Sequence, residues 1–151
     1  ELGKGLEKRF LIVAGIKKLD MAKNDKIIMT VEKTKTGFSA FCENYPIFTT
    51  GVSVPELMNN AYDAVNFYFE EQQKTIQPKQ VAFEIDFEQF FKYYKVLNAK
   101  FLAEKIGMNA SLLSQYVQGH KKPSKKQTER ILIGIHQIAQ ELSDINLLQT
   151  V

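Results

Sequence analysis

The chain has 151 residues, of which 44% are hydrophobic and 25% are charged, and its formal net charge at pH 7 is +3. This hydrophobic content is sufficient for a buried core, which excludes an intrinsically disordered chain, and the length is that of one ordinary domain or two small ones. No apolar run is as long as a membrane span, the N-terminus lacks the pattern of a signal peptide, and the single cysteine excludes an intrachain disulfide, so we expect a reduced, cytoplasmic protein.

Charge is distributed unevenly along the chain. Residues 21–86 carry six Lys against nine Asp/Glu, a balance of −3, whereas residues 87–151 carry nine Lys/Arg against five Asp/Glu, a balance of +4. An acidic segment followed by a basic one predicts two domains with different partners, a basic protein for the first and DNA for the second.

Residues 1–20 are predicted to form a short amphipathic helix that ends at Gly15. Met21 follows like a natural start, so we interpret residues 1–20 as an N-terminal extension. The segment resembles the C-terminal end of the HicA toxin family in Glu1-Leu2, Gly5-Leu6 and Ala14-Gly15. A cloning remnant or an ordinary N-terminal arm is an equal alternative, and we expect no toxin activity because the strand with that family's catalytic histidine is missing.

Alternating apolar residues predict β-strands from Lys26 onward. Residues 27–32 and 38–43 form two strands of a hairpin, because residues 35–37 (Lys-Thr-Gly) supply a turn between them. Residues 47–50 form a third short strand that ends at Gly51, and residues 81–86 a fourth.

A helix is predicted between the third and fourth strands. Ser53 is its N-cap, Pro55 lies in its first turn, and Glu56 completes a capping box. Its apolar face extends to near Gln73 and should cover the sheet, with Leu57, Ala61, Ala64, Val65 and Tyr68.

The order βββαβ of residues 21–86 resembles the N-terminal domain of HicB antitoxins. The matching residues are Gly37-Phe38-Ser39-Ala40, Glu43-Asn44-Tyr45-Pro46, Thr49-Thr50-Gly51 and Phe67-Tyr68-Phe69-Glu70. The chain departs from the family at Ile47-Phe48, where many members have Gly-Cys. The resemblance implies a partial RNase H-like sheet that binds a HicA-type ribonuclease toxin, and its candidate toxin-binding residues are Glu43, Tyr45, Glu56, Glu70 and Glu71.

Catalysis and metal binding are not expected. An RNase H enzyme holds two metal ions with clustered carboxylates, but the acidic residues of this segment are scattered over a strand, a bend and a helix. Cys42 has no second thiol or histidine near it in sequence, and His120 and His136 are isolated. We therefore expect no enzymatic activity and no cofactor, with a nuclease of divergent site as an alternative to be tested by cleavage of RNA–DNA hybrids.

The basic domain, residues 87–151, is predicted to be entirely helical. Its first helix, residues 87–97, is rich in aromatic residues that should be mostly buried. Residues 98–123 predict a helix-turn-helix: Leu102, Ala103 and Ile106 form one apolar face, Gly107 permits a left-handed turn, and the core continues in Met108, Leu113 and Tyr116. The outward residues suited to base edges are Asn109, Ser111, Ser114 and Gln115.

Positive charge concentrates beside this predicted helix-turn-helix. Residues 98–130 contain seven Lys/Arg against two Glu, a local balance of +5. Lysines expected to contact phosphates are Lys100, Lys121, Lys122, Lys125 and Lys126. The alternative interpretation is a solvated basic face without a ligand.

The same segment resembles the XRE (Cro-like) family of DNA-binding domains. The matching residues are Leu102-Ala103, Gly107-Met108 and Gly119-His120-Lys121-Lys122-Pro123, while Val117 stands where the family often has an acidic residue. The last helix, capped by Ser124, has an apolar side, and residues 145–151 suggest a dimer contact.

Together, the sequence predicts an α+β protein with a βββαβ partial RNase H-like domain followed by an all-α helix-turn-helix domain. The two resemblances imply a type II antitoxin that binds and neutralises a HicA-type toxin and represses its own operon. Its expected partners are that toxin, operator duplex DNA read in the major groove, and further copies of the chain as a homodimer or higher oligomer. The alternative is a stand-alone XRE-type regulator whose N-terminal domain senses a small ligand.

Overall fold

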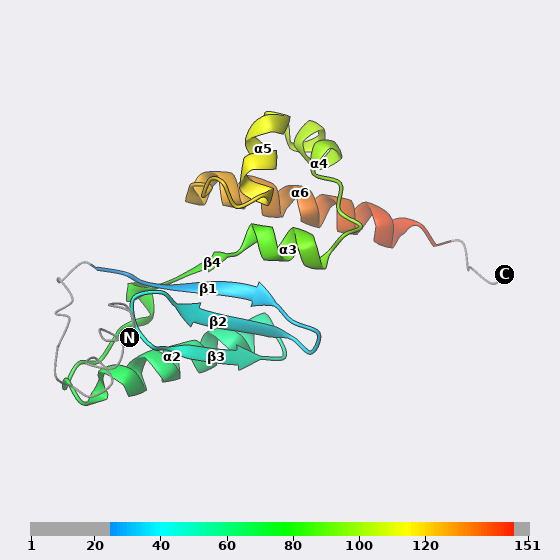
Figure 1. Ribbon diagram of the computed structural model, residues 1–151. Coiled ribbons are helices and arrows are strands. Elements are labelled where there is room, and N and C mark those ends of the chain that lie inside the picture. Colours follow the sequence, from blue (N-terminus) through cyan, green and yellow to red (C-terminus); the bar gives the residue numbers. More distant parts are fainter. Residues whose placement is uncertain (1–24, 147–151) are drawn as a thin grey trace, which may run out of the picture. The chain divides into compact units, whose positions relative to one another are not determined.

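The computed structural model describes residues 25–146, and the chain divides into two compact units, the first ending at Asp86 and the second beginning at Phe87 (Figure 1). The predicted α+β class is confirmed, because the described residues form one four-stranded mixed sheet and five α-helices. The helix predicted in residues 1–20 and most of the apolar C-terminal end, residues 147–151, lie outside the described residues. Within that description, none of the helices has the length and apolar character needed to cross a membrane.

The sheet of the first unit contains all four predicted strands. They are β1 (Ile27–Lys33), β2 (Phe38–Cys42), β3 (Phe48–Gly51) and β4 (Val81–Ile85), in the spatial order β3-β2-β1-β4. The pairs β1·β2 and β2·β3 are antiparallel, whereas β4 is parallel to β1. A parallel neighbour requires a long crossover, which helix α2 (Val54–Glu70) and the segment after it provide.

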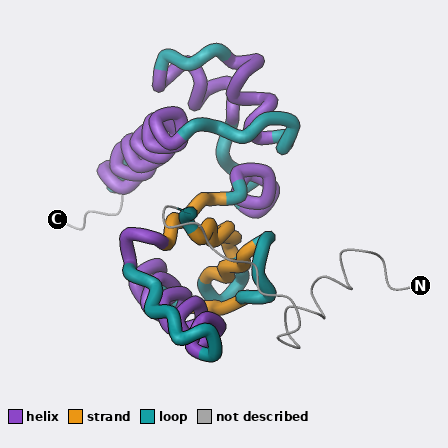
Figure 2. Tube along the Cα trace, turned by 90° about the vertical axis from the view of Figure 1, so that its left-hand side faces the viewer, coloured by secondary structure: helices purple, strands orange, loops and turns teal. Residues whose placement is uncertain are grey.

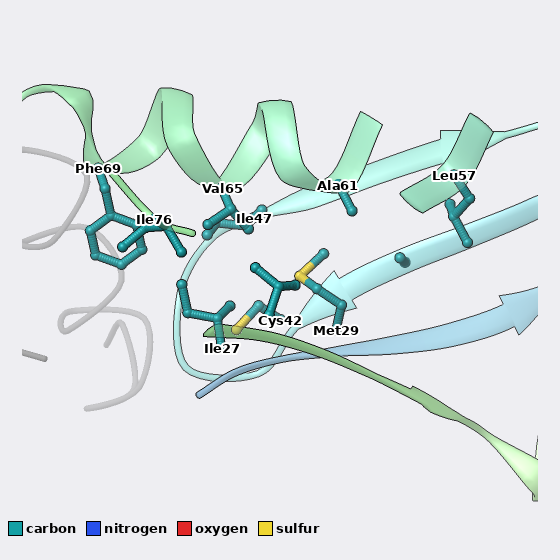
Figure 3. Packing of buried hydrophobic residues seen from close by; sticks show 11 residues of the cluster. Ile27, Met29, Cys42, Ile47, Leu57, Ala61, Val65, Phe69 and Ile76 are labelled. Carbon is teal, nitrogen blue, oxygen red and sulfur yellow. The ribbon is translucent and has the colours of Figure 1, made fainter. Parts of the chain in front are cut away.

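Helix α2 lies along one face of the sheet (Figures 1 and 2). Register places Met29 opposite Cys42 on one side and opposite Phe83 on the other, so apolar side chains from successive strands point to the same face. The helix meets them with Leu57, Ala61, Val65 and Phe69, all of them buried (Figure 3). The side chains between α2 and this face of the sheet form the hydrophobic core of the first unit.

The ends of α2 agree only partly with the prediction. Ser53 is the N-cap as expected, and its hydroxyl oxygen accepts a hydrogen bond of 3.3 Å from the Glu56 amide. The helix ends at Glu70 rather than near Gln73, because Gln73 has a left-handed φ of 53°, which a continuing helix cannot contain.

The described part of the second unit, residues 87–146, consists of four helices: α3 (Phe87–Tyr93), α4 (Ala99–Ile106), α5 (Ala110–Val117) and α6 (Lys125–Asp144). Its core contains five of the six residues predicted for the two central helices, together with two aromatics and one residue of α6: Phe87, Phe91, Leu102, Ala103, Met108, Leu113, Tyr116 and Ile131. The sixth, Ile106, is only half-buried. The predicted length of α3 was wrong, since it ends at Tyr93 and not at residue 97. Asn98 caps α4 with extended backbone (φ −94°, ψ 111°), so the chain must leave the helical path before it.

Glycine allows α6 to approach α4 closely. A Cβ atom on Gly134 would lie 2.2 Å from Ile106 Cγ2 and 2.9 Å from Leu102 Cδ1. Gly134 therefore sets the distance between the two helices, and through it the position of the α4–α5 pair on α6.

Candidate functional site

The turn between α4 and α5 has the backbone that the sequence predicted. Gly107 adopts φ 64° and ψ 34°, and its N–H bonds back to the carbonyls of the last turn of α4. A residue with a side chain rarely adopts this left-handed conformation, which explains glycine here. The turn leaves Met108 buried, so α5 starts against the same core as α4.

Arg130 of α6 holds the C-terminal end of α4, a role that the sequence did not indicate. Its Nη2 donates to the carbonyl oxygens of Ile106 at 2.8 Å and Gly107 at 3.2 Å, and its Nη1 donates to Gln127 Oε1 at 3.2 Å. These carbonyls are among those that a helix C-terminus leaves unpaired. Arg130 therefore acts as a cap on α4, although it was counted with the basic surface.

Replacing Arg130 with methionine should destabilise the second unit by about 1–3 kcal/mol, because charge-assisted hydrogen bonds to two carbonyls are lost while the aliphatic packing remains. Urea unfolding of the full chain measures this loss. If Arg130→Met unfolds like the wild type and only binding of nucleic acid weakens, Arg130 is a phosphate contact instead of a cap.

Helix α5 presents polar side chains outward. Ser111 and Gln115 are exposed and Ser114 is half-buried, and their spacing of three and four residues places them on one side of the helix. Asn109 differs from the prediction in that its side-chain oxygen accepts a 3.0 Å hydrogen bond from the Leu112 amide as the N-cap of α5. Reading an adenine with asparagine needs both the oxygen and the nitrogen, so the outward polar surface consists mainly of the other three residues.

The lysine loop, defined as residues 119–122, is attached to the end of α5. The carbonyl oxygen of Gln115 accepts hydrogen bonds from the amides of His120 at 2.9 Å and Lys121 at 3.3 Å, and Gly119 has a left-handed φ of 73°. The side chains of Lys121 and Lys122 are exposed. The residue that presents a polar side chain on α5 thus also holds the lysine loop by its backbone.

Helix α6 continues this basic surface. Ser124 is its N-cap and accepts a 3.2 Å hydrogen bond from the Gln127 amide, and the exposed Lys125 and Lys126 follow in the first turn. The positive charge of a lysine at a helix N-terminus is repelled by the positive end of the helix dipole. An anion bound there is attracted by both the lysines and the dipole. Lys100 is exposed in the first turn of α4.

Glu88 of α3 lies against the lysine loop. A Cβ atom on Gly119 would be 2.3 Å from Glu88 Oε2, so the glycine also permits this close approach. Glu88 pairs with Lys92 at 2.5 Å, and this hydrogen bond, with the attraction of Lys92 and then of His120, holds the pKa of the Glu88 carboxyl below its usual value. Helix α3 therefore places a carboxylate beside the lysine loop.

The acidic residues predicted to bind a toxin do not form one patch. Glu56 lies in the first turn of α2 and Glu70 at its end, about 21 Å apart along the helix axis. The Tyr45 ring contacts those of Phe69 and Tyr68 with centroid distances of 5.1 and 5.6 Å. The exposed members at this end of α2 are Glu43, Glu70 and Glu71.

Tyr45 itself is half-buried in this aromatic cluster. Burial raises the pKa of its hydroxyl, with smaller contributions from Cys42 and Asp25. Cys42 is buried at the end of β2. The ring of Tyr45 is thus largely part of the packing with Tyr68 and Phe69.

The structure brings together Ser111, Ser114 and Gln115 with the lysine loop and the start of α6, while Glu56 stands apart from the other acidic residues. No group of three or more His, Cys, Asp or Glu side chains within residues 25–146 could hold a metal ion. A scan against protein-family models, a search of curated proteins and a search of solved structures found no match for this chain.

Proposed function

We propose that the chain is a type II antitoxin that binds operator DNA with its second unit and a HicA-type ribonuclease toxin with its first. In this proposal α4, the turn at Gly107 and α5 form a helix-turn-helix, and the βββαβ unit is a partial RNase H-like domain. The observation that supports it most is the bond between the lysine loop and the Gln115 carbonyl, which links a basic surface to the polar side of α5.

The DNA part follows from charge and helix size. A helix of 10–12 Å diameter fits the major groove of B-DNA, which is about 12 Å wide. With α5 in the groove, the lysine loop and the first turn of α6 follow it along the chain, and their ammonium groups neutralise phosphates and release counterions. Ser111, Ser114 and Gln115 then face base edges, and an amide such as Gln115 pairs in two places with adenine.

Changing Gln115 to alanine tests the readout. The preference for the operator over a scrambled duplex should fall by about 1–3 kcal/mol, which is roughly 5- to 150-fold, while binding to the scrambled duplex stays nearly constant. Fluorescence anisotropy with both duplexes at one salt concentration measures this. Gln137→Ala, an exposed glutamine of α6, is the matched control. An unchanged preference in the Gln115 variant would remove this residue from the readout.

The toxin part follows from charge complementarity. An RNA-binding toxin is basic, and Glu43, Glu70 and Glu71 gather negative charge at one end of α2. Binding there would inhibit the toxin by covering its active site, without any chemistry by this chain.

Reversing two of these charges tests the toxin surface. Glu70→Lys combined with Glu71→Lys should weaken toxin binding at least tenfold through like-charge repulsion and leave DNA binding unchanged. Calorimetric titration with a HicA-type ribonuclease and an RNA-cleavage assay measure affinity and neutralisation. Asp63→Lys, also exposed but in the middle of α2, is the control. If the wild-type chain neither binds nor neutralises such a ribonuclease, the antitoxin proposal fails, and binding of a small molecule by the first unit would favour a ligand-sensing regulator.

A further inference from the structure

Phe67 has the most exposed large apolar side chain in the described part of the first unit, at 78%. The two residues after it pack inward: the rings of Tyr68 and Tyr45 lie 5.6 Å apart, and the buried Phe69 contacts both. A helix turns by about 100° per residue, so three consecutive aromatic side chains cannot all reach the core. A polar residue at position 67 would serve the fold equally well, so the packing of α2 does not explain the phenyl ring there.

The surface beside Phe67 is acidic. Glu70 and Glu71 follow it by three and four residues, which places the three side chains on one side of the helix, and both carboxylates are exposed. Residues 54–73 contain no Lys, Arg or His. The negative end of the helix dipole at the last turn of α2 is therefore not compensated by a basic residue of the helix. We call Phe67, Glu70 and Glu71 the Phe67 face.

The backbone under the Phe67 face is held by the segment that follows α2. The side-chain oxygen of Asn66 accepts a 2.8 Å hydrogen bond from the Ile76 amide, and the carbonyl oxygen of Phe69 accepts one of 3.0 Å from the Gln72 amide. Ordering of a flexible segment weakens association, and this segment is already bonded in place. The end of α2 therefore presents Phe67 in a fixed position.

We propose that Phe67 is the apolar anchor residue through which the chain holds a HicA-type toxin, with Glu70 and Glu71 against basic residues around the ring. This inference rests on the proposed function and names the residue that contributes most of the affinity. Negative charge repels nucleic acid and attracts a basic protein, which is the expected character of an RNA-binding toxin.

The two parts of the Phe67 face have different tasks. An aromatic ring that enters a pocket of the partner contributes mainly to the lifetime of a complex, because it must return to water on dissociation. Exposed carboxylates at the rim mainly accelerate association, and salt screens this effect. The contact is centred on the last turn and not on Asp63, one turn earlier, because the helix dipole acts only within the last turn.

Binding kinetics of the full chain with a purified HicA-type ribonuclease test this division, measured by biolayer interferometry at low and high salt. Phe67→Ala should raise the dissociation rate by roughly 10- to 100-fold at both salt concentrations and leave the association rate nearly unchanged. Glu70→Gln combined with Glu71→Gln should lower the association rate at low salt and have little effect at high salt.

Phe48→Ala is the matched control, because it removes a phenyl ring that is 65% exposed from β3 of the same unit. It should leave both rates at the wild-type value. In the absence of toxin, Phe67→Ala should change neither the sedimentation mass nor the urea midpoint of the chain, because its ring lies in solvent.

A Phe67→Ala variant that dissociates at the wild-type rate overturns the proposal, and so does a Phe48→Ala variant that dissociates as fast as Phe67→Ala. A lower mass of Phe67→Ala without toxin would assign the ring to a second copy, and a lower urea midpoint would assign it to a segment of the same chain; each contradicts a toxin contact. If the wild type binds no HicA-type toxin, the antitoxin proposal fails too. If the wild type binds and neutralises the toxin while the two phenylalanine variants behave alike, only the inference about Phe67 fails.

Discussion

Replacing Lys121 and Lys122 together with alanine should weaken binding to every duplex, specific or not, by roughly 10- to 100-fold at physiological salt. Each phosphate contact contributes about 0.9 to the slope of log affinity against log salt, so the slope should become less steep by about two. The two lysines belong to the loop that the Gln115 carbonyl holds at the end of α5, so their position depends on the helix proposed to enter the groove.

The comparison needs a variant with the same loss of net charge. Lys35→Ala with Lys79→Ala removes two exposed lysines from the first unit and should change affinity only slightly. An equal effect of both double variants would mean that overall charge, not the lysine loop, attracts the duplex. Wild-type affinity of the Lys121/Lys122 variant at every salt concentration would show that phosphates bind elsewhere.

Gly51→Ala should destabilise the first unit by roughly 3 kcal/mol or more. A Cβ atom on Gly51 would lie 2.4 Å from the backbone nitrogen of Leu57 and 2.7 Å from its Cα. These are backbone atoms of the first turn of α2, so no side-chain rotation can relieve the overlap, and the helix must move away from β3.

Urea unfolding followed by the near-ultraviolet circular dichroism of the tyrosines, which both units contain, measures this loss. Gly107→Ala is an informative comparison because it meets the opposite condition: nothing lies within 4 Å of its Cβ, but its φ is +64°. That variant should lose only about 1 kcal/mol, from backbone strain alone. A Gly51 variant within 0.5 kcal/mol of the wild type would contradict the close packing of α2 on β3.

Features that depend on neighbouring residues could be predicted from the sequence. Ser53 and Ser124 were recognised as N-caps and Gly107 as a left-handed turn, because a cap or a turn is determined by side chains within three or four residues. The alternation of apolar residues located all four strands for the same reason.

Features that depend on residues far apart in the sequence could not be predicted. The hydrogen bonds of Arg130 reach back 23 and 24 residues to the end of α4, and Glu88 meets a glycine 31 positions away. From the sequence alone, a charged residue such as Arg130 or Glu88 is predicted to be a solvent-exposed side chain without a structural partner. Asn109 is different, because an asparagine directly before a helical segment is a local signal for an N-cap. The predicted base contact of Asn109 does not take this signal into account.

The acidic surface illustrates why composition alone is insufficient. Residues 21–86 have the balance of −3 that suggests a basic partner, yet α2 separates Glu56 from Glu70 by about 21 Å. The positions of the acidic side chains in the folded helix, and not the net charge of the segment, decide which of them lie close enough to attract the same partner. Among the predicted residues, Glu70 lies at the end of α2 and Glu56 in its first turn, so these two charges cannot act at one point.

Operator recognition is tested by binding of the full chain to duplex DNA from the region upstream of its own gene. Anisotropy titrations should be run with this duplex and a scrambled duplex of the same composition over a series of salt concentrations. We expect at least 1,000-fold tighter binding to the upstream duplex and a steep salt dependence for both duplexes. Equal affinity for the two duplexes, or affinity that does not change with salt, would contradict it.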